Sequence, residues 1–135
     1  TSVAVLNLLT LSHLTNDDGF EPSIARAFGM FASRIEQGAR MVPMMMAALS
    51  AYHAGMSQIV VRGDAMRDVI RRQYLPFAIT LPLGNVEDSS HSDLVRLLPW
   101  IEPMVARADD PIAFVCRTFV CEAPVTSPRE LEAKL

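Results

Sequence analysis

The feature that most constrains this chain is a change in its hydrophobic pattern at Ser57. Before that residue, apolar side chains recur at the spacing of helices, and after it short β-branched runs alternate with helical patterns. Strands that alternate with helices are typical of a parallel sheet with right-handed crossovers. We therefore predict a mixed α/β protein with a helical part, residues 1–56, and an α/β part, residues 57–135, packed as one unit.

The helical part should contain three helices. Residues 3–14 are apolar on almost every side, which requires burial on several sides. The second helix starts at Glu21-Pro22 and the third runs from Pro43 to Ala54, with Gly55 as its C-terminal cap. Three such helices look like hairpins of a larger helical array, because they are too few to enclose a core alone. The methionines at the start of the third helix are interpreted as core filler: Met41, Met44, Met45 and Met46.

The α/β part should hold three parallel strands in the order β-α-β-α-β. The strands are expected at residues 58–62, 77–81 and 113–117. One helix, ending before Pro76, contains Met66, Val69, Ile70 and Tyr74, and another, after a polar loop over residues 84–92, contains Leu94, Leu97 and Leu98. Ser127-Pro128-Arg129-Glu130 is a capping box, so a short terminal helix should begin there.

Composition excludes several classes of partner. The 135 residues carry a net charge of −3, with no basic patch suited to nucleic acid or anionic lipid. No stretch reaches the ~20 apolar residues of a membrane span, so no membrane association is expected. Two cysteines do not form a disulfide framework, which favours a reducing, cytoplasmic location. Because the chain begins without Met and inside a helical pattern, we expect a segment upstream of it.

The two cysteines, Cys116 and Cys121, are the first candidates for chemistry, as a redox pair. In one straight strand, five steps of ~3.3 Å would place their Cα atoms roughly 16 Å apart and on opposite faces. A disulfide needs Cα atoms within about 7 Å, and hence a sharp turn at Thr118-Phe119, where no Gly or Pro favours one. Separate structural thiols are the preferred interpretation, with a disulfide or redox pair second and a metal site third.

The histidines give no metal-ligand spacing, since His13, His53 and His91 lie in separate segments. We therefore predict no metal and no cofactor. In parallel sheets, ligands bind beyond the carboxyl ends of the strands. That rule makes four residues candidates for a ligand-binding rim: Gly63, Asp64, Gly84 and Arg117. No glycine-rich phosphate loop accompanies them.

Several runs together resemble a known family. They are Ser2–Leu9, Ile59–Gly63, Tyr74-Leu75-Pro76, Leu97-Leu98-Pro99 and, most specifically, Phe114–Leu131 with its Cys-x4-Cys and Ala-Pro-Val-Thr. In this order they are similar to the C-terminal end of the spermatogenesis-associated, thioredoxin-domain-containing proteins. The resemblance implies an upstream thioredoxin-like domain, absent here, followed by an α/α toroid similar to six-hairpin glycosidases and epimerases. Residues 1–56 would then be the last toroid hairpins, and residues 57–135 a terminal α/β subdomain.

Three hypotheses for function follow. The first is a structural and interaction role without autonomous catalysis, with the upstream domains of the same protein as partners and with self-association of the isolated piece. The second is a redox-active thiol module using Cys116 and Cys121. The third is a contribution to a carbohydrate-binding or epimerase-like toroid.

Overall fold

The computed structural model of this chain describes residues 1–85, 89–107 and 109–135. It divides into two units, Thr1–Met56 and Ser57–Leu135, and each is described by itself. None of the helices in the described ranges combines the length and the apolarity that a bilayer crossing requires.

The first unit consists of the three helices predicted for this region. They are α1 (Ser2–Thr15), α2 (Glu21–Gly38) and α3 (Pro43–Ala54), with short 3₁₀ turns at Asp18–Phe20 and Ala39–Met41. Gly55, with φ at 72°, caps α3 as expected, because glycine adopts the left-handed region without a Cβ clash. Helix α1 packs mainly against α3. The buried residues of the three helices are Val5, Leu9, Ile24, Ala27, Met45, Ala48 and Ala51.

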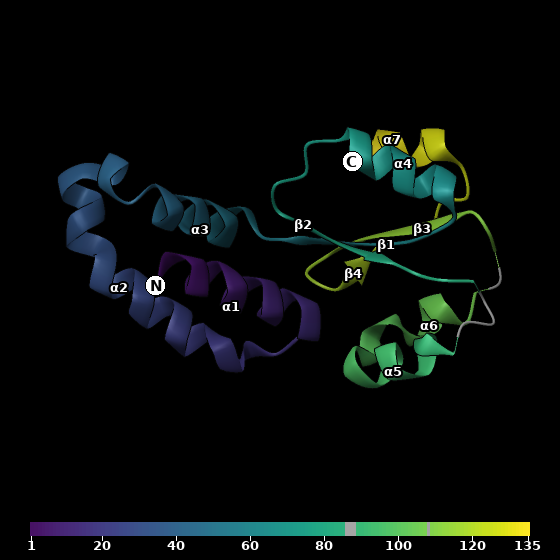
Figure 1. Ribbon diagram of the computed structural model, residues 1–135, viewed down its shortest axis with the longest axis horizontal. Helices are drawn as coiled ribbons and strands as arrows, with labels where there is room; N and C mark the ends of the chain where they lie inside the picture. Colours follow the sequence, from purple (N-terminus) through teal and green to yellow (C-terminus); the bar gives the residue numbers. More distant parts are fainter. Residues whose placement is uncertain (86–88, 108) are drawn as a thin grey trace. The chain divides into compact units, whose positions relative to one another are not determined.

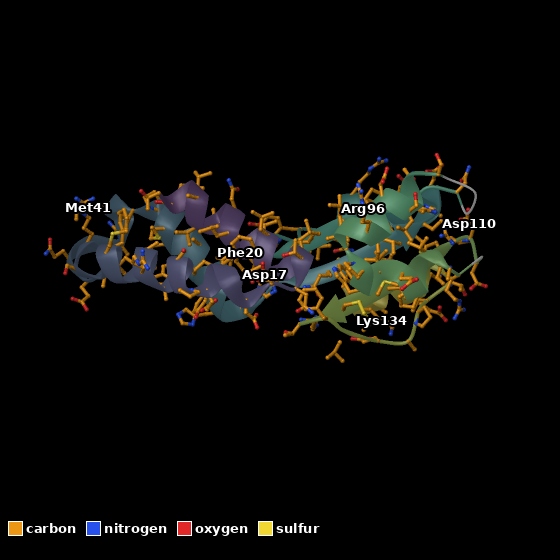
Figure 2. The ribbon with its side chains drawn as sticks, turned by 90° about the horizontal axis from the view of Figure 1, so that it is seen from below. Asp17, Phe20, Met41, Arg96, Asp110 and Lys134 are labelled. Carbon is orange, nitrogen blue, oxygen red and sulfur yellow. A yellow bond between two sulfur atoms is a disulfide. The ribbon has the colours of Figure 1, made fainter. Side chains whose placement is uncertain are left out.

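The methionines of this unit do not all fill its core. Met45 is fully buried, as expected, but Met41 is 65% exposed and Met44 is 48% exposed. Met41 lies at the end of the unit, where α2 turns into α3 (Figure 2). The interpretation of these two side chains as core filler is wrong for the chain as it stands, because three helices offer too little interior to cover them.

The second unit is built on a four-stranded sheet. Its strands are β1 (Ser57–Arg62), β2 (Ala78–Pro82), β3 (Ile112–Arg117) and β4 (Val120–Cys121), in the spatial order β2-β1-β3-β4. Strands β1 and β2 are parallel and are joined through helix α4 (Asp64–Arg72), as predicted. This helix ends before Tyr74, which was expected inside it.

The prediction of three parallel strands is wrong for β3, which is antiparallel to β1. Arg62, the last residue of β1, pairs with Ile112, the first residue of β3. The chain between β2 and β3 forms two short helices, α5 (Ser90–Leu97) and α6 (Glu102–Val105), with a 3₁₀ turn at Pro99–Ile101. This excursion brings the chain back at the same end of the sheet that it left. The short strand β4 was not predicted.

The two faces of the sheet are covered by different helices. Helices α4 and α7 (Pro128–Lys134) lie on one face, and α5 and α6 lie on the other side (Figure 1). The first face encloses a core of alternate strand residues and helix residues: Ile59, Val61, Met66, Ala113, Val115, Val125 and Leu131. The alternation of side chains along a strand therefore directs Gln58, Arg62 and Cys116 to the second face.

Two local predictions concern the segments around the sheet. The terminal helix is confirmed, with the Ser127 hydroxyl accepting a hydrogen bond from the Glu130 amide at 3.3 Å. The polar loop expected over residues 84–92 is shorter, because α5 already begins at Ser90. Residues 86–88 of that loop lie outside the described residues.

Candidate functional site

The two cysteines form a disulfide across a β-hairpin. Strands β3 and β4 pair so that Cys116 lies directly opposite Cys121, with their Cα atoms 3.9 Å apart. The preferred interpretation as two separate thiols is therefore wrong. It assumed one continuous strand, whereas the chain reverses direction between the two residues. No other cysteine is present, because the sequence contains only these two.

The reversal takes place over two residues, Thr118 and Phe119. Both have positive φ values, 49° and 60°, which a two-residue hairpin turn of type I′ requires. Asn and Gly are the residues that adopt this conformation readily, and a β-branched residue such as Thr seldom does. The turn could not be found from residue preferences, but the four-residue spacing between the cysteines fits a two-residue turn with one further pair inside it.

The disulfide joins a buried cysteine to an exposed one. Cys116 is completely buried in β3, whereas Cys121 is exposed on the edge strand. At the tip of the hairpin, the ring of Phe119 contacts that of Trp100 edge-to-face, with centroids 5.4 Å apart. Val120 is 75% exposed beside them. The hairpin tip therefore presents apolar surface next to the accessible end of the disulfide.

A charged group follows directly after Cys121. Lys134, labelled in Figure 2, donates a hydrogen bond to the Glu122 carboxylate at 2.7 Å. This hydrogen bond and the charge of Lys134 lower the pKa of Glu122, and the charge of Arg117 lowers it further. Two cations thus lie close to the carboxylate beside the exposed cysteine.

The four residues proposed as a ligand-binding rim are not brought together. Gly63, Asp64 and Gly84 follow the carboxyl ends of β1 and β2, as expected. Arg117 pairs with Ser57 at the opposite end of β1, because β3 is antiparallel. At ~3.3 Å per residue, the two ends of the six-residue strand are roughly 16 Å apart. A rim that includes Arg117 therefore does not form.

The three remaining rim residues make different contacts within the chain. Gly63 has a φ of 92°, and a Cβ built on it would lie 2.5 Å from Asp110 Oδ1. Asp64 pairs with Arg67 on the surface, with its side chain 95% exposed. The Gly84 carbonyl accepts a hydrogen bond from Arg62 Nε at 3.2 Å.

Arg62 is the residue that sequence reasoning missed at this end of the sheet. Its side chain is buried, and its guanidinium donates hydrogen bonds to the carbonyls of Gly84, Val105 and Arg107. It therefore joins the end of β1 to the segment after β2 and to the end of α6. The one signal in the sequence is its place at the end of a buried apolar strand.

Metal-ligating groups do not gather in the described part of the chain. Over residues 1–85, 89–107 and 109–135, no three His, Cys, Asp or Glu side chains lie close enough to hold a metal ion. His53 instead packs against the ring of Tyr52, with centroids 5.5 Å apart. His91 is buried in α5.

Comparison with known proteins identifies relatives over the whole chain. It is 29% identical to spermatogenesis-associated protein 20 of Homo sapiens, over 99% of this chain, and 28% identical to the protein of that name in Rattus norvegicus. An uncharacterized protein of Caenorhabditis elegans is 28% identical over 98% of the chain. The chain spans 18% of the length of each of these relatives. No family model and no solved structure matches the chain.

Proposed function

Because this chain is related over its whole length to spermatogenesis-associated protein 20, we propose that it is a structural and interaction portion of a longer protein, without catalysis of its own. The matched segment is about a fifth of the length of each relative. In a protein of that length, the rest of the chain would be available for this segment to pack against. In this proposal, the helices of the first unit are the last hairpins of an α/α toroid, and the second unit is the C-terminal α/β subdomain.

The observation that carries this proposal is the exposure of large apolar side chains on the first unit. Val3 is 56% exposed on α1, Met30 is 65% exposed on α2, and Met41 and Met44 are exposed where α3 begins. Such side chains on neighbouring helices favour burial against further helices, since apolar surface removed from water is stabilising. Additional hairpins of a toroid are the partner that would bury these side chains.

We expect the 135-residue chain alone to self-associate through these exposed apolar side chains. Sedimentation velocity at increasing concentration should show species larger than the monomer. The triple variant Val3→Ser, Met30→Gln, Met41→Gln should shift the chain to the monomer, because it removes apolar area without touching the buried core. Tyr74→Ser is the matched control, since Tyr74 is 88% exposed in the second unit and should leave the association unchanged.

A stable monomer would contradict this prediction. If the unmodified chain were a monomer at every concentration and unfolded in one cooperative transition, the exposed surface would need no partner. The interaction role would then be rejected.

A thiol–disulfide role is the second candidate, favoured by the bond between Cys116 and Cys121. One end of this bond is exposed, and the turn that it closes holds Thr118 and Phe119 in the left-handed region. A left-handed residue other than glycine costs roughly 1–2 kcal/mol. Accessible or strained disulfides are the ones that exchange with thiols, whereas purely structural disulfides resist the glutathione pool.

We expect the disulfide to open reversibly within the range of biological thiol buffers. The chain is equilibrated in glutathione buffers of defined potential, and its thiols are counted by alkylation and mass spectrometry. Two thiols should appear together, with a midpoint more positive than about −300 mV, the value below which structural disulfides lie. The variant Cys116→Ser, Cys121→Ser sets the background of zero thiols. A bond that stays intact at about −300 mV would mark a purely structural disulfide and reject this role.

A further inference from the structure

The hairpin disulfide has one accessible end, and this determines how a thiol can open it. A thiolate must reach a sulfur atom in line with the S–S bond, so access decides which of the two is attacked. Cys121 is exposed on the two-residue edge strand, whereas Cys116 is 0% exposed in β3. Building on the proposed thiol–disulfide role, we propose that Cys121 accepts the incoming thiolate, Cys116 is the leaving group, and the buried amide of Gln58 stabilises the departing Cys116 thiolate.

The exchange requires a low-molecular-weight thiol as co-reactant. Its thiolate forms a new S–S bond to Cys121 Sγ, and the bond between Cys121 and Cys116 breaks. The electron pair of the broken bond goes to Cys116 Sγ, which leaves as a thiolate and later takes a proton from water. A second thiol then attacks the co-reactant's sulfur in the mixed disulfide and releases Cys121. The two thiols are oxidised to a disulfide, and the hairpin is reduced to two thiols.

Cys116 is a poor leaving group because its sulfur lies in a buried position. A thiolate in buried, apolar surroundings is unfavourable, and poor leaving groups slow the exchange. Phe114, which shares the face of Cys116 two residues earlier in β3, is also buried, so the sulfur departs into an environment with little water. A hydrogen-bond donor beside Cys116 would therefore stabilise the departing thiolate and speed up the exchange.

Gln58 is placed to supply that donor. In the antiparallel β1–β3 register, Gln58 is the direct partner of Cys116. Directly opposed residues have Cβ atoms about 4.5–5.5 Å apart and share one face of the sheet, which brings the amide within reach of the sulfur. Gln58 is completely buried, and a side-chain amide carries two N–H donors.

The first test asks which sulfur is attacked. The oxidised chain is mixed briefly with reduced glutathione, quenched in acid and digested with trypsin. Cleavage after Arg117 separates the two cysteines, since Cys116 lies in the peptide that ends at Arg117 and Cys121 lies in Thr118–Arg129. We expect the glutathione adduct on Thr118–Arg129. An adduct mainly on the peptide that ends at Arg117 would overturn the proposed order.

The second test asks what Gln58 does. The rate of reduction by glutathione is measured for Gln58→Leu and for Gln37→Leu, which makes the same change at an exposed position of α2. We expect Gln58→Leu to slow reduction about tenfold, the effect of one lost hydrogen bond to a charged group, and Gln37→Leu to leave it unchanged. A purely structural loss would loosen the sheet and speed up reduction, so slowing separates the two roles.

An unchanged or faster rate in Gln58→Leu would overturn the role of Gln58. These results differ from failure of the thiol–disulfide role itself, in which the unmodified chain gives neither thiols in the titration nor an adduct with glutathione.

Discussion

Replacing Arg62 with methionine should lower the free energy of unfolding of the second unit by about 3 kcal/mol. A hydrogen bond to a charged group contributes roughly 1.5–3 kcal/mol, and removal of the donor leaves its buried acceptors unpaired. Arg62 supplies three such bonds, to the carbonyls of Gly84, Val105 and Arg107. Methionine has no donor and matches only the aliphatic stem of arginine, so it keeps the packing of the stem and removes the buried guanidinium with its hydrogen bonds.

The measurement is urea unfolding followed by the fluorescence of Trp100, the one tryptophan of the chain. Arg62→Lys should recover only part of the loss, because an ammonium group cannot spread three donors in the plane of a guanidinium. Arg71→Met is the control, since Arg71 is 75% exposed in its pair with Asp68 and should change stability by less than about 1 kcal/mol. If Arg62→Met were as stable as this control, the three hydrogen bonds would contribute nothing.

The second large effect is expected at Gly63, where alanine should also cost about 3 kcal/mol or more. The backbone there has φ 92° and ψ 141°, a combination that strains a residue with a Cβ by roughly 1–3 kcal/mol. The added Cβ would lie 2.5 Å from Asp110 Oδ1, 2.9 Å from Pro111 Cβ and 3.1 Å from Pro111 Cα. The contact with Pro111 Cα is with backbone, so rotation of a side chain cannot relieve it.

Gly29→Ala is the matched control for this prediction. Gly29 lies inside α2, and a Cβ there meets nothing within 4 Å. Alanine should stabilise that helix by roughly 0.5–1 kcal/mol, measured by circular dichroism during urea unfolding, so the same substitution should have opposite signs at the two glycines. Removing the Asp110 carboxylate in a Gly63→Ala, Asp110→Ala variant should restore only part of the loss. Equal effects of alanine at both glycines would contradict the conformational argument.

The sequence predicted the elements well where local patterns are strong. The β-branched run that ends at Arg62, the crossover helix with Met66 and the Ser127 cap are confirmed, because each depends on neighbours close in sequence. The direction of β3 could not be predicted in this way. A connection of two short helices can end at either end of a sheet, and the choice depends on the packing of α5 and α6.

The site was predicted only in part for a similar reason. Both cysteines were identified, but their pairing depends on two positive φ values that neither Thr118 nor Phe119 favours by itself. The hairpin forms because β3 and the segment after it pair as a whole, with Val125 bridging back to Ala113. In the sequence, Gln58 and Arg62 are polar residues at the two ends of a strand. Both side chains are buried because β1 lies between β2 and β3 in the sheet.

The order of the strands also determines when this unit can fold during synthesis. Strand β1 is central, so its two partners are β2, which follows soon after it, and β3, which ends at Arg117. Pairing across such a sequence distance is slow, because the loop must close before the contacts form. While Arg117 is still inside the ribosome, the part of the chain that has emerged therefore contains the apolar strand β1 with one edge unpaired. Binding by chaperones should be strongest in that interval and should end once the hairpin has emerged.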